Sequence, residues 1–114
     1  FAGRNISTLE VESVVRQHPD VKDVAAFGIP SSELESEDEL MLSVVLKDRA
    51  KPSHEELCAF INDNGPHYFV PRYMTFVDSL PYTATNKVKK FVLREAGVCE
   101  QTWDLKKSDY RVQR

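Results

Sequence analysis

One lysine in the C-terminal third of the chain has surroundings that suit contact with an oxyanion or a phosphate. Lys87 lies in the run Leu80-Pro81-Tyr82-Thr83-Ala84-Thr85-Asn86-Lys87-Val88-Lys89-Lys90, a polar turn between two apolar stretches. Thr83 and Thr85 offer hydroxyls, and Asn86 tolerates the left-handed backbone that a tight turn often needs. A fixed cation is effective in a closed, dry site and weak in open water. The residues alone leave two interpretations open, a catalytic contact and a solvated surface lysine.

The sequence shows no other catalytic or metal-binding pattern. It contains no glycine-rich phosphate loop, no Cys–His pair and no Ser–His–Asp order. Its three histidines, His18, His54 and His67, are scattered, so we expect no metal site. Glu10 and Glu12 lie two positions apart on a predicted helix and diverge, so we do not expect a catalytic pair.

Length and composition favour a single ordinary domain. The chain has 114 residues, of which 41% are hydrophobic and 29% are charged. Its net charge of −3 argues against a general nucleic-acid binder, which is usually basic. No apolar run approaches the roughly 20 residues of a membrane span. The cysteines, Cys58 and Cys99, match no metal motif and follow no secretory signal, so we expect a cytoplasmic protein in which Cys58 is buried.

Two helices are predicted from capping boxes and apolar spacing. The first covers residues 8–18, with Ser7 and Glu10 as its capping box and with Pro19 ending it. Its predicted buried stripe is Val11, Val14, Val15 and His18. The second opens at Ser53, which pairs with Glu56, and continues through Leu57, Phe60 and Ile61. We expect Gly65 to end it as a left-handed C-cap.

Three strands are predicted over residues 21–29, 39–47 and 70–77. The middle segment is apolar on both faces, with Leu40, Leu42, Val44 and Leu46 alternating against Met41 and Val45, so it should be central and covered. An acidic run, expected to be a solvated loop, joins the first two strands and suits an antiparallel pair. Residues 88–96 predict a short helix, and residues 98–114 a polar tail anchored by Trp103. The fold class is α+β, a small three-stranded sheet covered by helices.

Four further motifs occur in one order along residues 1 to about 97. They are the G-x-N-I-S-x-x-E-V-E run at 3–12, His18-Pro19-Asp20-Val21 followed by Phe27-Gly28-Ile29-Pro30, Phe69-Val70-Pro71-Arg72, and Phe76-Val77-Asp78-Ser79-Leu80-Pro81. With the lysine segment, this order resembles the C-terminal lid domain of adenylate-forming (AMP-binding) enzymes, which include acyl-CoA synthetases, luciferases and peptide-synthetase adenylation domains. The resemblance implies a lid domain over residues 1–97 and a tail over 98–114.

The sequence departs from the family pattern at two places. The usual loop reads T-x-x-G-K, whereas here Asn86 replaces the glycine, and asparagine is the next-best residue for a left-handed backbone. A glycine common near residues 37–39 is also missing. The stretch from Lys87 to Val98, with Thr102-Trp103-Asp104 beyond it, resembles acyl-CoA ligases grouped around crotonobetaine/carnitine-CoA ligase.

The resemblance implies an acid–thiol ligase of two steps. A carboxylic acid and ATP form an acyl-adenylate and pyrophosphate, and the thiol of coenzyme A then displaces AMP. Lys87 would be catalytic in the first step, with Thr83 and Thr85 near the substrate. Gly3 would let the backbone approach the pantetheine in the second step, and Arg4 would contact CoA phosphates or remain an exposed arginine.

The same resemblance implies what the chain lacks. ATP, coenzyme A and Mg would be bound mainly by a large N-terminal domain of the same polypeptide, so these 114 residues should be inactive alone. Two alternatives remain open. One is the lid of another adenylate-forming enzyme, such as a peptide-synthetase module with a carrier-protein acceptor. The other is a non-catalytic interaction module that binds a partner through its basic helix and Trp103.

Overall fold

The computed structural model describes residues 6–30 and 38–114 as an α+β domain. Its helices are α1 (Thr8–Arg16), α2 (His54–Asn64) and α3 (Lys90–Ala96), with 3-10 turns η1 (His67–Phe69) and η2 (Leu105–Lys107). Its strands are β1 (Val21–Pro30), β2 (Asp38–Leu46), β3 (Tyr73–Phe76) and β4 (Trp103–Asp104). The predicted fold class and order of elements are confirmed.

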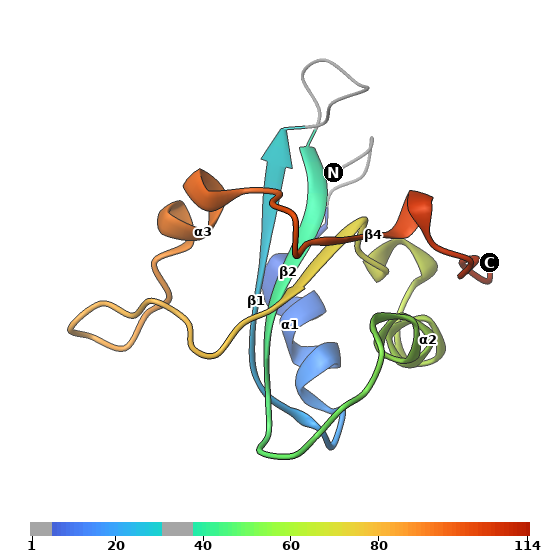
Figure 1. Cartoon of the computed structure of the whole chain (residues 1–114), viewed down its shortest axis with the longest axis horizontal. Helices are drawn as coiled ribbons and strands as arrows, with labels where there is room; N and C mark the ends of the chain where they lie inside the picture. The colour runs from blue at the N-terminus through green and yellow to red at the C-terminus, as the bar shows by residue number, and fades with distance from the viewer. Residues whose placement is uncertain (1–5, 31–37) are drawn as a thin grey trace.

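The sheet has one strand more than the sequence predicts. Its order is β1-β2-β3-β4, with β2 antiparallel to β1 and parallel to β3 (Figure 1). The central position of β2 and its antiparallel pairing with β1 are confirmed. The prediction of three strands is wrong because β4, in which Trp103 lies opposite Met74, is too short to show an alternating pattern.

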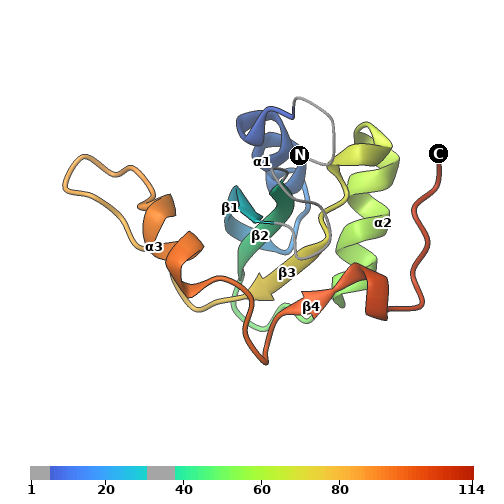
Figure 2. The ribbon, with the colours of Figure 1, turned by 90° about the horizontal axis from the view of Figure 1, so that it is seen from above.

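The two faces of the sheet have separate cores. The first core lies on the face that α1 and α2 cover and includes Val24, Ala26, Leu42 and Met74. The second core lies on the opposite face and includes Ala25, Phe27, Met41, Tyr73 and the buried Leu80, with Val88 and Leu93 packed against it. In Figure 2, α1 and α2 accordingly lie apart from α3 and from the loop that precedes it. The segment around Lys87 is therefore attached to its own side of the sheet.

Both long helices begin where predicted, although among the described residues only the serine half of each capping box forms. The side chain of Ser7 accepts a hydrogen bond from the backbone N–H of Glu10, and that of Ser53 accepts one from Glu56. The buried stripe of α1 differs from the prediction, because it consists of Val11, Glu12 and Val15. A carboxylate occupies this stripe since it has partners there, as described below.

The end of α2 differs from the prediction at Gly65. This residue has extended backbone, with φ −156° and ψ 179°, and is not a left-handed cap. A Cβ at this position would lie 3.1 Å from Cδ2 of Phe69 and 3.5 Å from Cγ2 of Val14. Glycine is therefore used here for the close approach of η1 and α1 to the end of α2.

The free edge of β1 is covered by polar side chains of α1. The backbone N–H of Ala26 donates to Oε2 of Glu12 at 2.8 Å, and Arg16 donates to the carbonyl of Val24 at 3.3 Å. These groups have no strand partner because β1 is the first strand of the sheet. Capping the edge in this way removes a template for unwanted strand pairing.

The segment after α3 packs against the domain. Trp103 and Tyr110 are partly buried against the first core, so the predicted anchoring by Trp103 is confirmed. Cys58 is completely buried, also as predicted. Of the helices in the described residues, none has the length and apolar character to cross a membrane.

Candidate functional site

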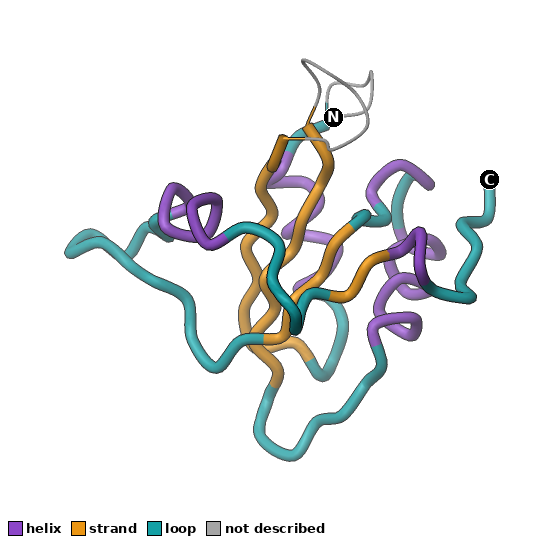
Figure 3. The backbone as a smooth tube through the Cα atoms, turned by 45° about the horizontal axis from the view of Figure 1, so that its top comes forward, coloured by secondary structure: helices purple, strands orange, loops and turns teal. Residues whose placement is uncertain are grey.

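Residues 81–89, the lysine loop, form a small hairpin that projects from the domain. Tyr82 and Val88 make an isolated antiparallel bridge, and the backbone N–H of Lys89 donates to the carbonyl of Pro81 at 2.8 Å. Because Val88 is paired across the hairpin, α3 begins at Lys90 and not at the predicted Val88. Figure 3 shows the loop extending away from the sheet on the side of α3.

The tip of the lysine loop is shaped by Asn86 and Thr83. Asn86 has a positive φ of 63°, which confirms the left-handed backbone expected of the residue that replaces glycine. The hydroxyl oxygen of Thr83 accepts hydrogen bonds from the N–H groups of Thr85 and Lys87, at 3.3 and 3.2 Å. It also lies 3.1 Å from the hydroxyl of Thr85. Thr83 therefore holds the turn together, and Lys87 follows it at a fixed position.

Lys87 is exposed to solvent, and it makes no ion pair with any residue in the ranges 6–30 and 38–114. Lys90, three residues further on, is instead held in an ion pair. Of these two lysines, Lys87 is the one that can meet a ligand from outside the domain.

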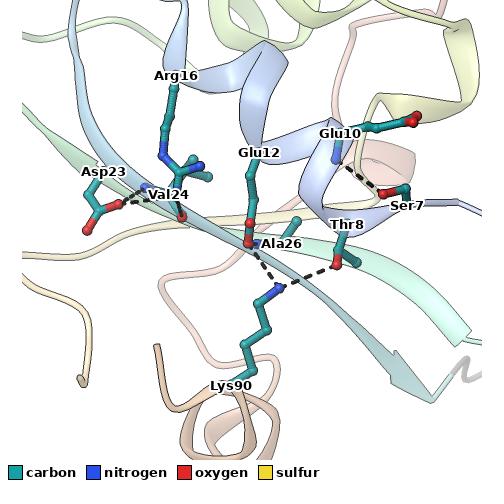
Figure 4. A network of polar contacts seen from close by, with 9 residues as sticks. All are labelled: Ser7, Thr8, Glu10, Glu12, Arg16, Asp23, Val24, Ala26 and Lys90. Atoms are coloured by element: carbon teal, nitrogen blue, oxygen red, sulfur yellow. Dashed lines mark hydrogen bonds and ion pairs between the residues drawn. The ribbon is translucent and has the colours of Figure 1, made fainter. Parts of the chain in front are cut away.

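Both legs of the hairpin are attached to α1 and β1 by polar contacts. On the first leg, the hydroxyl of Tyr82 donates to the carboxylate of Asp23, which is 3.7 Å from the guanidinium of Arg16. After the second leg, Nζ of Lys90 lies 3.0 Å from Oε2 of Glu12 and 3.4 Å from the hydroxyl of Thr8. Figure 4 shows the Lys90 side chain reaching from α3 to Glu12 on α1, close to Ala26 of β1.

These attachments were not predicted from the sequence, although one signal was present. Thr8, Val11, Glu12 and Val15 have the spacing of one helix face, so a carboxylate on that face required a buried partner. In Figure 4 the side chain of Glu10 points away from Glu12, as expected of residues that form no catalytic pair. The prediction that capping occupies the Glu10 side chain is wrong, because only its backbone N–H bonds to Ser7 and its carboxylate is exposed.

The structure brings three of the five predicted site residues together. Lys87, Thr83 and Thr85 share the lysine loop. Gly3 and Arg4 lie outside the described residues. Most of the acidic run lies outside them too, although Asp38 and Glu39 begin β2. In the part of the chain that the structure describes, no three His, Cys, Asp or Glu side chains gather to hold a metal ion.

The lysine loop takes no part in the cavity formed beside β2 and η1 by described residues. That cavity has a volume of about 450 Å³, and its described lining includes Leu40, His67, Tyr68 and Arg72 but no residue of the loop. A projecting cation surrounded by water stabilises negative charge weakly, and it becomes effective when a second surface excludes the water. The geometry therefore indicates that the lysine loop forms one side of a site and that a second surface must form the other.

Comparison with known proteins agrees with this geometry. The family model described as the AMP-binding enzyme C-terminal domain matches residues 10–87. The 2-methylpropanoate–CoA ligase of Humulus lupulus is 33% identical over 82% of this chain. The chain spans 17% of the length of that relative.

Solved structures show the same relationship. The acyl-CoA synthetase of Brucella canis matches 82% of this chain with a TM-score of 0.75 and 29% identity. The amide bond synthetase of Marinactinospora thermotolerans matches 82% with a TM-score of 0.74 and 34% identity. In both cases the matched part is 18% of the solved chain.

Proposed function

The chain belongs to the AMP-binding enzyme C-terminal domain family, and we propose that it serves as the lid of an ATP-dependent acyl-CoA ligase. The whole reaction converts a carboxylic acid, ATP and coenzyme A into acyl-CoA, AMP and pyrophosphate through an acyl-adenylate. The remaining part of the site belongs to a larger N-terminal domain of the same polypeptide. The proposal for the domain boundary is a lid over residues 1–97 followed by a tail over 98–114.

This proposal rests on Lys87, which is exposed at the tip of a hairpin that polar contacts attach to α1 and β1. In the first step a carboxylate oxygen of the acid attacks the α-phosphorus of ATP, and the bond to the bridging oxygen of pyrophosphate breaks. Lys87 stabilises the negative charge that gathers on the carboxylate and α-phosphate oxygens. Thr85, whose hydroxyl is exposed beside that of Thr83, lies on the same loop and supplies a hydrogen bond to the substrate.

The second step uses a different face of the lid. The thiol of coenzyme A attacks the carbonyl carbon of the adenylate, and AMP leaves. Gly3 and Arg4 are proposed to line this face, the glycine for close approach and the arginine for the phosphates of coenzyme A. A rotation of the lid between the two steps presents each face when it is needed.

The nucleotide and the metal depend on the rest of the polypeptide. The ammonium of Lys87 and the loop hydroxyls fit a phosphate, whereas hard cations such as Mg²⁺ prefer several oxygen ligands together. The described residues bring no such acidic group together. We therefore assign Mg²⁺ and most contacts of ATP to the N-terminal domain. When bound there, Mg²⁺ would neutralise charge on the phosphates.

Exposed apolar side chains support docking against a larger domain. Leu9 and Phe91, which are 72% and 59% exposed, lie next in sequence to Thr8 and Lys90, which contact each other. Val98 is 50% exposed just after α3.

We propose the cytoplasm as the compartment. Cys58 and Cys99 are both free thiols, the state in which the reducing cytoplasm would keep them. Assignment to the crotonobetaine/carnitine-CoA ligase group rests on the sequence motifs of the C-terminal stretch alone.

The change Lys87→Ala in the full-length enzyme tests the proposal. Adenylate formation should fall by about 10²- to 10³-fold, the usual effect of losing one preorganised contact to developing charge. Thioester formation from supplied acyl-adenylate should be nearly unchanged. Both half-reactions are measured separately, by pyrophosphate release and by acyl-CoA release.

Two comparisons sharpen this experiment. Lys89→Ala removes a neighbouring cation of the same loop and should leave both half-reactions close to those of the unmodified enzyme. The isolated 114-residue chain should form no acyl-CoA from acid, ATP and coenzyme A. Equal losses of both half-reactions in Lys87→Ala would show that the lysine is structural.

A further inference from the structure

The ion pair between Glu12 and Lys90 lies at the base of the lysine loop, and we propose that these two residues position Lys87. Their contact fixes the direction in which the hairpin leaves the domain. The consequence for adenylate formation rests on the proposed function, whereas the effect on the loop itself does not.

Glu12 is an unusual residue to find buried in this helix. It is 4% exposed, and its Oε2 atom receives the N–H of Ala26 at 2.8 Å and the ammonium of Lys90 at 3.0 Å. A buried carboxylate is costly unless it is paired and hydrogen-bonded. Lys90 therefore supplies the second partner of the Glu12 carboxylate, beside the N–H of Ala26. Its ammonium is held in place by α1 and by the edge of β1 together.

The ammonium of Lys90 is held by two residues of the same helix face. Thr8 and Glu12 are one turn apart on α1, and their oxygens lie 3.4 and 3.0 Å from Nζ of Lys90. Lys90 starts on the opposite side of the sheet, where Leu93 of α3 packs against the second core. Its side chain thus passes the free edge of β1 and joins the two layers (Figure 4).

Apolar packing holds α3 weakly. The helix has seven residues, none of them buried, and Phe91 and Val92 are exposed large hydrophobic residues. Burial therefore contributes little to its position, and the polar contact of its first residue contributes correspondingly more. Because Lys90 directly follows the second leg of the hairpin, its position also determines where that leg ends.

The other leg supplies the second point of attachment. With Tyr82 bonded to Asp23 and Lys90 bonded to Glu12, the base of the hairpin is held on both sides of the bridge between Tyr82 and Val88. When the Lys90 contact is lost, the hairpin can pivot about the Tyr82 contact. Displacing a catalytic group by about 1 Å can cost about 10²-fold in rate. An ion pair that touches no substrate would then control how well Lys87 is placed.

Backbone dynamics of the 114-residue chain test the proposal without any assumption about activity. In the unmodified chain, the order parameters of the Asn86 and Lys87 amides should be close to about 0.85, the value of rigid backbone. In Glu12→Gln and in Lys90→Met they should fall below about 0.6, or show exchange in relaxation dispersion if the motion is slower. Amides of β1 and β2 should keep their values.

Matched variants separate positioning from a general loss of stability. Glu10→Gln changes an exposed carboxylate on the same helix, and Lys89→Met changes the lysine next to Lys90; both should leave the loop ordered. Lys90→Arg, unlike Lys90→Met, should keep the loop amides ordered, because a guanidinium can also pair with Glu12. Loop amides that stay as ordered in Glu12→Gln and Lys90→Met as in the unmodified chain would overturn the proposal.

A double variant covers the case in which a single change unfolds the chain. Removing one partner of a buried pair leaves a charge without compensation, whereas removing both leaves none. Glu12→Gln combined with Lys90→Met should therefore fold and still have a mobile loop. An ordered loop in this double variant would refute the positioning role.

The full-length enzyme supplies the catalytic readout. Lys90→Met should lower adenylate formation by about tenfold to a hundredfold, with thioester formation from supplied adenylate retained and with Lys90→Arg restoring the first step. Unchanged adenylate formation, or equal loss of both steps, would contradict a positioning role. If the unmodified enzyme formed no adenylate, the proposed function would fail, and the dynamics of the isolated chain would still decide the role of the ion pair.

Discussion

At the scale of single residues, two backbone conformations in the described chain are costly for most side chains. Apart from glycine, Arg49 and Asn86 have positive φ angles there, of 68° and 63°. Asparagine visits the left-handed region more readily than arginine, because its short polar side chain can hydrogen-bond locally. The same φ is therefore more strained at Arg49, in the turn after β2, than at Asn86 in the lysine loop.

Replacing each of these residues with glycine should reveal that difference. Arg49→Gly should raise the free energy of unfolding by about 0.5 to 1 kcal/mol, since the left-handed strain of about 1 to 2 kcal/mol exceeds the entropic cost of glycine. Asn86→Gly should change it by less than about 0.5 kcal/mol, like most surface substitutions. Urea titrations of both variants, with unchanged m-values, measure the effect. A gain at position 86 as large as at position 49 would contradict this assignment of strain.

The sequence predicted those residue properties that depend on neighbours along the chain. The left-handed backbone of Asn86 follows from its place in a tight turn, and the burial of Cys58 follows from its apolar neighbours. The partnership of Glu12 with Lys90 could not be read in this way, because the two residues meet only when α1 and α3 pack around the edge of β1. Helical spacing places Glu12 on a buried face, but no local pattern names its partner.

At the scale of elements, a stack of three rings attaches β4 to the domain. The ring of His54, at the start of α2, lies 4.2 Å from that of Phe76 on β3 and 5.6 Å from that of Trp103 on β4, with nearly parallel planes. Burial lowers the pKa of His54, and the nearby carboxylate of Glu55 partly opposes this effect. The neutral imidazole is thus the form favoured in contact with the Phe76 and Trp103 rings.

Acid should loosen this attachment. The pKa of His54 is lower in the folded state than its ordinary value of 6.5, so the unfolded state binds more protons as the pH falls through that value. The contribution of the stack to stability is therefore present above about pH 6.5 and is lost below it. Trp103 is the single tryptophan of the chain, and its fluorescence reports on the stack directly.

The measurement is the thermal midpoint followed by this fluorescence between about pH 7.5 and pH 5. The midpoint of the unmodified chain should fall by more than that of His54→Phe, whose ring keeps the stacking and cannot be protonated. His67→Gln should behave like the unmodified chain. Parallel decreases in the unmodified chain and in His54→Phe would exclude His54 as the source.

Elements were predicted well where their pattern was long. Both capped helices and the apolar β2 were recognised, because each had several residues at the period of its own structure. Two-residue β4 was missed, since its existence depends on the pairing of Trp103 with Met74. The predicted left-handed conformation of Gly65 was wrong for a related reason. Glycine is required there by the nearby side chain of Phe69 and not by the end of the helix.

At the scale of the whole molecule, the sheet separates a stabilising core from the surface that carries the lysine loop. The side under α1 and α2 contains Val11, Val15, Leu57, Cys58 and Ile61, each at most 1% exposed. The side under α3 is closed by Leu80, Val88 and Leu93, of which only Leu80 is buried. Global unfolding should thus be governed by the first core, while the second side can move locally at lower cost.

The thiol of Cys58 makes the stability of the first core measurable through pH. Burial raises its pKa to about 12 from an ordinary value of 9.0, and the negative charge of Glu55 acts in the same direction. Between these two values the folded state keeps the thiol proton and the unfolded state has lost it. The free energy of unfolding should therefore be unaffected by this group below about pH 9 and should fall above it, by up to about 1.4 kcal/mol per pH unit.

Urea titrations between about pH 8 and pH 10.5 test this linkage in the 114-residue chain. Cys58→Ala should be less stable at pH 8, because it leaves a small cavity, but its stability should decline less steeply with pH. Cys99→Ala should not make the decline less steep, because hydrogen bonds with the Thr102 hydroxyl and with the backbone of Gln101 lower the pKa of the exposed Cys99 thiol. The difference in slope between the unmodified chain and Cys58→Ala cancels the titration of groups that do not interact with Cys58. Tyr110 is not one of these, because its pKa is raised by burial and also by the negative charges of Cys58 and Asp63. Equal slopes would mean that Cys58 ionises in the folded state, and hence that the first core opens to water without unfolding.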